Sequence, residues 1–211
     1  MALPDVAGLF FVPCFCYNGA KRNRRMRDMQ LHREMTTKDG ARLTVRSLTA
    51  ADAQAALWVM HQCMGESLNL SRYPDEVRMT VSQEVEFIEK AQYNPSAVLL
   101  GAFADGEMAG MCSAVPVAPN ERYRHRAGMG IMVLRKHWGR GIGSALMAAQ
   151  REAMENTCVE QIELDVVSTN SAAIALYEKH GFVRYGLLER GMKYRDGSYA
   201  DLLLMKLNLK K

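Results

Sequence analysis

The sequence has few of the residues that build metal sites and disulfide frameworks. Its 211 residues include five cysteines and five histidines. The cysteine number is odd, the cysteine spacing does not match that of a zinc site, and no two histidines are separated by three residues. We therefore expect no bound metal, and reduced cysteines of the kind usual in a cytoplasmic protein.

Long apolar runs are absent as well. No stretch approaches the roughly 20 apolar residues that a membrane helix needs. The apolar segment 6–16 is short, contains Pro13 and is not preceded by basic residues, unlike a secretory signal. These features predict a protein that is neither embedded in a membrane nor secreted.

A broad basic stripe is also missing. The formal net charge is +4, and residues 1–40 hold seven Lys/Arg against four Asp/Glu. The remaining chain is nearly balanced, so we expect no nucleic-acid partner. We predict that residues 1–40 are a poorly ordered extension and that residues 41–211 form one domain. Two alternatives for the extension are a basic arm for nucleic acid or acidic lipid, and a segment that precedes a translation start at Met29.

The hydrophobic pattern after residue 40 predicts a mixed α/β domain. Alternating and helical periodicities follow one another in the order β-α-α-β-β-β-α-β-α-β-β, and an Asp-Gly turn joins the second and third strands. This order predicts a central mixed, mostly antiparallel sheet flanked by helices. The predicted segments are strand 42–48, helices 49–64 and 80–92, hairpin 97–117, strand 127–134, helix 141–156, strand 161–167, helix 170–180 and hairpin 182–209.

Three glycines precede the helix at 141–156. Gly139, Gly141 and Gly143 are spaced as in loops whose backbone N–H groups surround a phosphate. An ATP- or GTP-binding loop needs a lysine after its glycines, and none follows here. A dinucleotide-binding loop needs a third glycine where Ser144 stands, and it normally opens its domain, whereas four predicted strands come first.

Two blocks around this loop carry a family resemblance. "GIMVLRKHWGRGIGSALM" (130–147) and "ELDVVSTNSAAIALYEKHGFVRYG" (163–186) resemble the GNAT superfamily of acetyl-CoA-dependent N-acetyltransferases. The resemblance extends over residues 42–207. The family's loop motif corresponds to residues 138–143, with Trp138 in place of the usual first residue.

The resemblance implies direct transfer of an acetyl group from acetyl-CoA to a primary amine. The pantetheine and thioester would lie on the backbone of strand 127–134, and the pyrophosphate on the helix start, where free N–H groups and the helix dipole attract anions. The residues that match the family's cofactor-binding positions are Ile131, Met132, Val133, Gly139, Arg140, Gly141, Ile142, Gly143, Ser144 and Asn170.

Acyl transfer also needs a proton acceptor for the amine and a proton donor for the thiolate. By resemblance, Tyr177 is the donor; its alternative role is an aromatic core residue. Asn170 has a second reading as a helix N-cap. Asp165 matches the place of an acid in the bacterial ribosomal-protein acetyltransferases, and Glu66, His125 or a water chain are alternative bases.

The acceptor is expected between the segments 65–76, 116–125 and 190–198, which mix both charges. A small amine or an amino acid is the favoured acceptor, and a protein N-terminus or lysine is the alternative. A non-catalytic acyl-CoA-binding module and a dinucleotide-dependent oxidoreductase are competing functions. A homodimer is compatible with the sequence.

Overall fold

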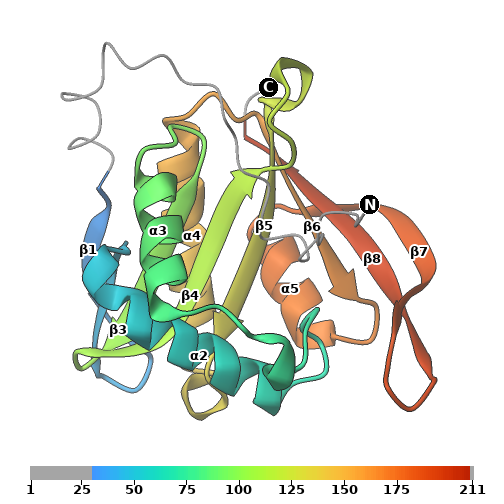
Figure 1. The fold of residues 1–211 in the computed structure, drawn as a ribbon, viewed down its shortest axis with the longest axis horizontal. Helices are drawn as coiled ribbons and strands as arrows, with labels where there is room; N and C mark the ends of the chain where they lie inside the picture. The colour runs from blue at the N-terminus through green and yellow to red at the C-terminus, as the bar shows by residue number, and fades with distance from the viewer. Residues whose placement is uncertain (1–29, 210–211) are drawn as a thin grey trace.

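Eight strands form one sheet in the structure, a computed structural model that describes residues 30–209 of the protein (Figure 1). The strand order is β1-β2-β3-β4-β5-β6-β8-β7, and only the β5–β6 pair is parallel. The strands are β1 (His32–Thr36), β2 (Arg42–Ser47), β3 (Val98–Ala104), β4 (Glu107–Pro116), β5 (Arg126–Val133), β6 (Gln161–Val167), β7 (Val183–Lys193) and β8 (Tyr199–Asn208). The helices are α2 (Ala53–Glu66), α3 (Val81–Gln92), α4 (Ile142–Glu155) and α5 (Ser171–Lys179). The predicted mixed sheet flanked by helices is confirmed.

Local sequence signals explain several element boundaries. Helix α3 begins at a capping box in which the Thr80 and Gln83 side chains each accept the other residue's backbone N–H. The β3–β4 hairpin turns at Asp105 and Gly106, which both have positive φ, as a two-residue hairpin loop requires. These are the signals that the sequence displays most openly.

One strand lies outside the predicted domain. Strand β1 belongs to the segment predicted as a poorly ordered extension, yet it pairs antiparallel with β2 along its whole length. All five β1 side chains are exposed, so the strand shows no apolar alternation and depends on main-chain pairing and on buried Leu31. The folded part therefore begins before residue 41. The basic cluster at 21–27 and Met29 lie outside the described residues.

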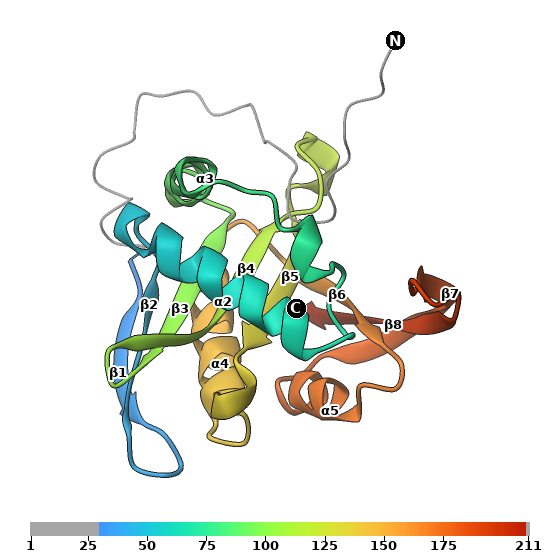
Figure 2. The ribbon, with the colours of Figure 1, turned by 60° about the horizontal axis from the view of Figure 1, so that its bottom comes forward.

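Two hydrophobic cores cover the two faces of the sheet. The α4–α5 core, which includes Leu146, Ile174 and Met205, fills the space between the sheet and those helices. The α2–α3 core, which includes Val59 and Ile88, lies on the other face (Figure 2). Within residues 30–209, no helix is long and apolar enough to cross a membrane.

Strands β5 and β6 diverge, which opens the sheet at its centre. They pair only through Arg126–Gly128 and Gln161–Glu163, although both strands continue for several residues beyond these segments. Figure 1 shows them separating from the top of the view toward the bottom. The described part of the chain thus leaves one edge of β5 without a strand partner beyond residue 128.

Candidate active site

Backbone groups of β5 point into the opening at every second residue. In an antiparallel pair, residues bonded to the partner alternate with residues whose N–H and C=O groups point away. Leu134 N–H donates to the Ala109 carbonyl at 2.9 Å, and Val117 N–H donates to the Arg126 carbonyl at 3.2 Å. Even-numbered residues of β5 therefore face β4, and odd-numbered residues face the opening.

The three predicted residues of this strand consequently differ in their placement. Ile131 and Val133 direct their main-chain groups into the opening, and their side chains pack against the α4–α5 core. Met132 directs its main-chain groups toward β4, and its side chain is buried in the α2–α3 core. Ile131 and Val133 are the two that can hold a pantetheine chain by backbone hydrogen bonds.

The glycine loop leads from β5 into α4. Gly139 and Gly141 have φ of +76° and +91°, a left-handed conformation that favours glycine. Gly141 is the N-cap of α4 and provides no side-chain cap, so the first N–H groups of the helix, including those of Ile142 and Ser144, have no intrahelical partner. The loop thus fits a phosphate, because it presents free donors at the positive end of a helix dipole.

Gly143 has a packing role beside the cofactor-binding role predicted for it. A Cβ atom added at Gly143 would lie 3.2 Å from Cδ2 of Leu176 in α5. Glycine at this position lets α4 and α5 approach each other closely. Nearby, the Ser144 hydroxyl and the His180 Nε2 are 2.8 Å apart, which joins the start of α4 to the end of α5. Burial lowers the pKa of His180, which favours the neutral imidazole.

Arg140 is already engaged by protein groups. Its Nε lies 2.7 Å from Asp39 Oδ2, and its Nη1 lies 2.7 Å from His137 Nδ1. A hydrogen bond from Thr37 and another from Arg140 lower the pKa of Asp39, and burial lowers the pKa of His137. A charged carboxylate and a neutral imidazole therefore hold this guanidinium at the loop.

Helix α5 positions Asn170 and Tyr177. The Asn170 side chain accepts the backbone N–H of Ala173 at 3.3 Å, so it caps the helix. Tyr177 is 8% exposed, and its ring centroid lies 5.8 Å from that of Phe182. Burial raises the pKa of Tyr177 to about 12, and its hydroxyl makes no hydrogen bond to any described residue. The Tyr177 ring is therefore part of the core, and its hydroxyl is protonated and has no hydrogen-bond partner among the described residues.

Asp165 lies on the opposite face of the sheet from Tyr177. Its strand neighbours Leu164 and Val166 are buried in the α4–α5 core, so Asp165 projects toward the α2–α3 side, as Glu163 does. Burial, and to a lesser extent the charge of Glu163, raises the pKa of Asp165. Asp165 and Tyr177 therefore lie on opposite faces of the sheet.

The neighbours of Asp165 differ from it in their pairing. Glu163 forms an ion pair with Arg126, which holds the pKa of Glu163 below its usual range. Asp165 has no ion-pair partner among residues 30–209. Burial raises the pKa of the Tyr185 hydroxyl, and the nearby charges of Glu163 and Asp165 raise it further. Sequence reasoning did not select Tyr185, because its strand position gives no sign of which residues lie across β8.

The two alternative bases lie elsewhere. The Glu66 carboxylate accepts the backbone N–H of Arg135 at 2.7 Å, which places it where β5 leaves the sheet. His125 precedes β5, and its carbonyl accepts the N–H groups of Glu160 and Gln161 at the paired, closed end of the two strands. Because a strand rises about 3.3 Å per residue, His125 is far from Val133 at the other end.

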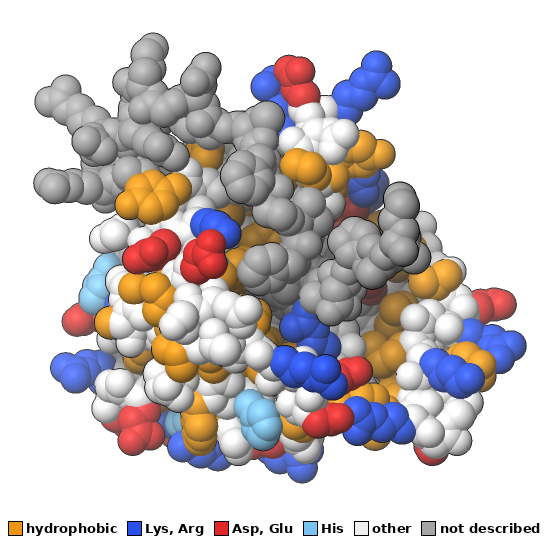
Figure 3. Space-filling view, in the orientation of Figure 1, with side chains coloured by type: hydrophobic (Ala, Val, Ile, Leu, Met, Phe, Trp, Pro, Cys, Tyr) orange, Lys and Arg blue, Asp and Glu red, His pale blue; other side chains and the backbone are white. Residues whose placement is uncertain are grey.

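Two of the three predicted acceptor segments meet. The Arg195 guanidinium in the β7–β8 turn lies 2.7 Å from Asp75 Oδ2 in the α2–α3 loop, and its backbone N–H donates to the Tyr73 hydroxyl at 3.0 Å. Segment 116–125 instead joins β4 to β5 at the opposite end of the sheet (Figure 1). Figure 3 shows positive and negative side chains intermixed along the lower edge of this face. A cavity of about 40 Å³ between loop and hairpin is lined by Met64, Ser67, Leu68, Leu70, Ser71, Arg72, Tyr73, Met192, Lys193 and Tyr194.

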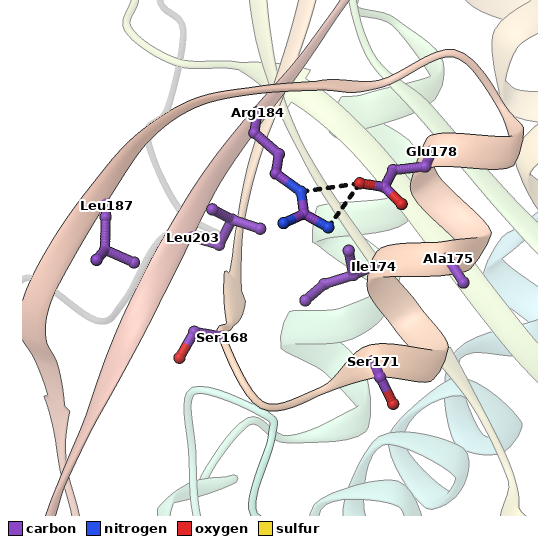
Figure 4. Close-up of a pocket in the computed structure, with 8 residues that line it drawn as sticks. All are labelled: Ser168, Ser171, Ile174, Ala175, Glu178, Arg184, Leu187 and Leu203. Carbon is purple, nitrogen blue, oxygen red and sulfur yellow. Dashed lines mark hydrogen bonds and ion pairs between the residues drawn. The ribbon is translucent and has the colours of Figure 1, made fainter.

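A larger cavity of about 410 Å³ lies between α5 and the β7–β8 hairpin (Figure 4). Ile174 and Leu203 line it, and an ion pair between Arg184 and Glu178 at 2.8 Å closes one side. None of the candidate catalytic or cofactor-binding residues lines this cavity. No group of three or more His, Cys, Asp or Glu residues suited to a metal occurs in the described part of the chain.

The structure combines an opening beside β5, an uncapped glycine loop and a buried tyrosine, as expected of an enzyme that binds acyl-CoA. The profile described as "Acetyltransferase (GNAT) family" matches residues 66–182, more than half of the chain. The L-amino acid N-acetyltransferase AaaT of Escherichia coli is 36% identical over 120 residues, which are 56% of this chain and 72% of that protein. The chain belongs to the GNAT family and is an acetyl-CoA-dependent N-acetyltransferase.

Solved structures agree with this assignment. A GNAT-family acetyltransferase from Streptococcus pneumoniae superposes with a TM-score of 0.76 at 28% identity, covering 79% of this chain and 99% of its own. YncA from Salmonella typhimurium, solved with its cofactor acetyl-CoA, superposes with a TM-score of 0.73 at 18% identity, covering 80% and 95%. At 18% identity, the similarity to YncA shows a shared fold.

Proposed function

We propose that the protein acetylates the amino group of an amino acid or another small primary amine by direct transfer from acetyl-CoA. Direct transfer is supported by the opening between β5 and β6, which has free backbone groups of β5 along one side. Tyr177 and Asp165 lie on opposite faces of the sheet at this opening. The amino-acid acceptor is supported by the similarity to an L-amino acid N-acetyltransferase.

The cofactor supplies an activated acetyl thioester, and the chain's own groups position it. The N–H groups of Ile131 and Val133 orient the thioester carbonyl and stabilise the negative charge that develops on its oxygen. The free N–H groups at the start of α4, including that of Ile142, bind the pyrophosphate. These backbone contacts do not depend on side-chain identity, which is why apolar residues suffice in this part of β5.

Two side chains move the protons. Asp165 accepts a proton from the acceptor ammonium, so that the neutral amine forms the new C–N bond while the C–S bond breaks. Tyr177 gives its proton to the departing sulfur, and the second proton that the nitrogen loses as the amide forms restores the Tyr177 hydroxyl. Burial raises the pKa of Tyr177 to about 12, so its hydroxyl carries its proton at neutral pH and has it available for the sulfur.

The acceptor binds between the α2–α3 loop and the β7–β8 hairpin. Serine hydroxyls, Arg72 and Lys193 line that cavity together with apolar groups. Cationic groups there suit the carboxylate of an amino acid. At about 40 Å³ the cavity is smaller than typical ligand pockets, so acceptor binding requires the loop and hairpin to separate.

The test is a panel of amino acids, simple amines and peptides offered with acetyl-CoA, with thiol release and product mass as readouts. Acetylation of one or a few free amino acids at the α-amino group is the expected result. Faster turnover of peptides than of free amino acids would show that the acceptor is a protein. Tight acetyl-CoA binding without turnover of any amine would indicate a non-catalytic binding module.

The expectations about environment and assembly remain predictions. Cys63, Cys112 and Cys158 are the free thiols among the described residues, and a cytoplasmic location is a proposal. Size-exclusion chromatography with light scattering would test the homodimer that the sequence allows.

A further inference from the structure

The β1–β2 turn (residues 37–41) lies against the glycine loop. Lys38 N–H donates to the Arg140 carbonyl at 3.1 Å, and Asp39 pairs with the Arg140 guanidinium. Thr37 holds the turn itself, since its hydroxyl bonds to Asp39 at 2.5 Å and its N–H bonds to the Ala41 carbonyl at 2.9 Å. An element that precedes the family-matched region thus meets the start of α4 (Figure 2).

The Lys38 side chain runs beside the N-terminus of α4. Its Cγ and Cε lie 3.7 and 3.9 Å from the position that a Cβ on Gly141 would occupy. One further C–N bond of about 1.5 Å keeps the ammonium within about 5.4 Å of that position. Gly141 is the uncapped residue whose following N–H groups are free, so the ammonium and these donors face the same small region.

The two cations of this region differ in their pairing. Arg140 is neutralised by Asp39 and hydrogen-bonded to His137. Lys38 has no carboxylate partner within residues 30–209, and its one described hydrogen bond comes from its backbone N–H. Lys38 is therefore the cation that is not paired with a carboxylate among the described residues of this region. Arg140 holds the turn that carries Lys38.

We propose that Lys38 binds a phosphate group of coenzyme A and supplies the side-chain charge that sequence reasoning assigned to Arg140. The inference rests on the proposed acetyl-CoA-dependent function. A lysine ammonium reaches phosphate oxygens as a mobile point charge, and it adds to the backbone donors and helix dipole already directed there. In this arrangement β1 and its turn are part of the cofactor site.

The test is calorimetric binding of coenzyme A, 3′-dephospho-coenzyme A and pantetheine to the full chain and to Lys38→Ala. We expect Lys38→Ala to weaken coenzyme A binding about tenfold, the loss of roughly one charge-assisted hydrogen bond. Pantetheine has no phosphate, so its binding is expected to stay unchanged. A loss that persists with 3′-dephospho-coenzyme A assigns the contact to the pyrophosphate, and a loss that disappears assigns it to the 3′-phosphate.

Two further variants separate local contact from general effects. Lys38→Arg keeps a cation and is expected to retain most of the affinity. Arg33→Ala removes a cation from the same hairpin, where Arg33 pairs with Glu152, and is expected to leave coenzyme A binding unchanged. The Lys38→Ala deficit is also expected to shrink as salt rises, because the contact is open to solvent.

The failure modes are distinct. Unchanged coenzyme A affinity in Lys38→Ala overturns the inference and leaves the proposed function intact. An equal loss of pantetheine binding overturns it too, since it would show a structural effect on the whole site. A wild-type protein that binds no coenzyme A refutes the proposed function and the inference together.

Discussion

The indole Nε1 of Trp138 lies 2.6 Å from the carbonyl oxygen of Val133. That carbonyl belongs to the edge of β5 that faces the opening, and Trp138 is the loop residue that departs from the family motif. The indole N–H therefore donates to a main-chain carbonyl that has no strand partner in the described part of the chain. This hydrogen bond joins the glycine loop to the end of β5. The Arg135 guanidinium, 5.4 Å from the indole ring, contributes to holding it there.

Trp138→Phe should loosen the glycine loop without unfolding the protein. The substitution keeps a ring but removes the N–H donor, and a hydrogen bond of this kind contributes about 1 kcal/mol, or roughly fivefold in affinity. We expect coenzyme A binding to weaken by about that factor in calorimetry. Trp58→Phe, on an equally exposed tryptophan of α2, is the matched control. Unchanged affinity in Trp138→Phe would mean that the bond does not order the loop.

Asp165→Asn should lower kcat about 100-fold, because the amide cannot accept the ammonium proton. In the wild type, kcat/KM should fall as pH decreases through the raised pKa of Asp165, since the protonated carboxyl is no base. In Asp165→Asn this acidic limb should disappear, which a pH–rate profile measures.

The stability of Asp165→Asn provides an internal control. Because folding raises the pKa of Asp165, the charged form destabilises the native state above that pKa, so the asparagine variant should be at least as stable at neutral pH. Glu163→Gln, on the same face but paired with Arg126, should retain the acidic limb. A limb that survives in Asp165→Asn would assign the base elsewhere, with Glu66 or a water chain as the next candidates.

Tyr177→Phe separates the two roles of this side chain. The variant keeps the ring against Phe182 and loses a hydroxyl that bonds to no described residue, so the melting temperature should change little. A donor role predicts a drop in kcat of about 100-fold with unchanged coenzyme A affinity. Tyr199→Phe, in the exposed hairpin, is the control. Wild-type kcat in Tyr177→Phe would leave the residue with its packing role alone.

Arg195→Ala should affect the acceptor and spare the cofactor. The Asp75–Arg195 contact is exposed, so its loss should hardly alter the melting temperature. The contact joins the two walls of the acceptor cavity, which must separate to admit the acceptor, so without it KM for the amine should fall several-fold while KM for acetyl-CoA stays constant. Steady-state kinetics with each substrate varied in turn measures both. Equal changes in the two KM values would contradict the assignment of this cavity to the acceptor.

Sequence reasoning recovered the elements that carry local signals. The helix of residues 170–180 was expected from an N-cap asparagine and a terminal glycine, and the structure places Asn170 as the cap and α5 behind it. Strand β1 escaped because its side chains are all exposed, and a strand that depends on main-chain pairing leaves no apolar alternation to detect.

The sequence alone determined the family, the order of elements from β2 onward and the position of the glycine loop before α4, because these depend on periodicity and on local motifs such as Gly139 and Gly141. The tertiary structure decided which groups face the site. It turned Met132 away from the opening, paired Arg140 with Asp39 and brought Lys38 to Gly141. Such relations join residues about a hundred positions apart, and only the pairing of strands and packing of helices brings them together.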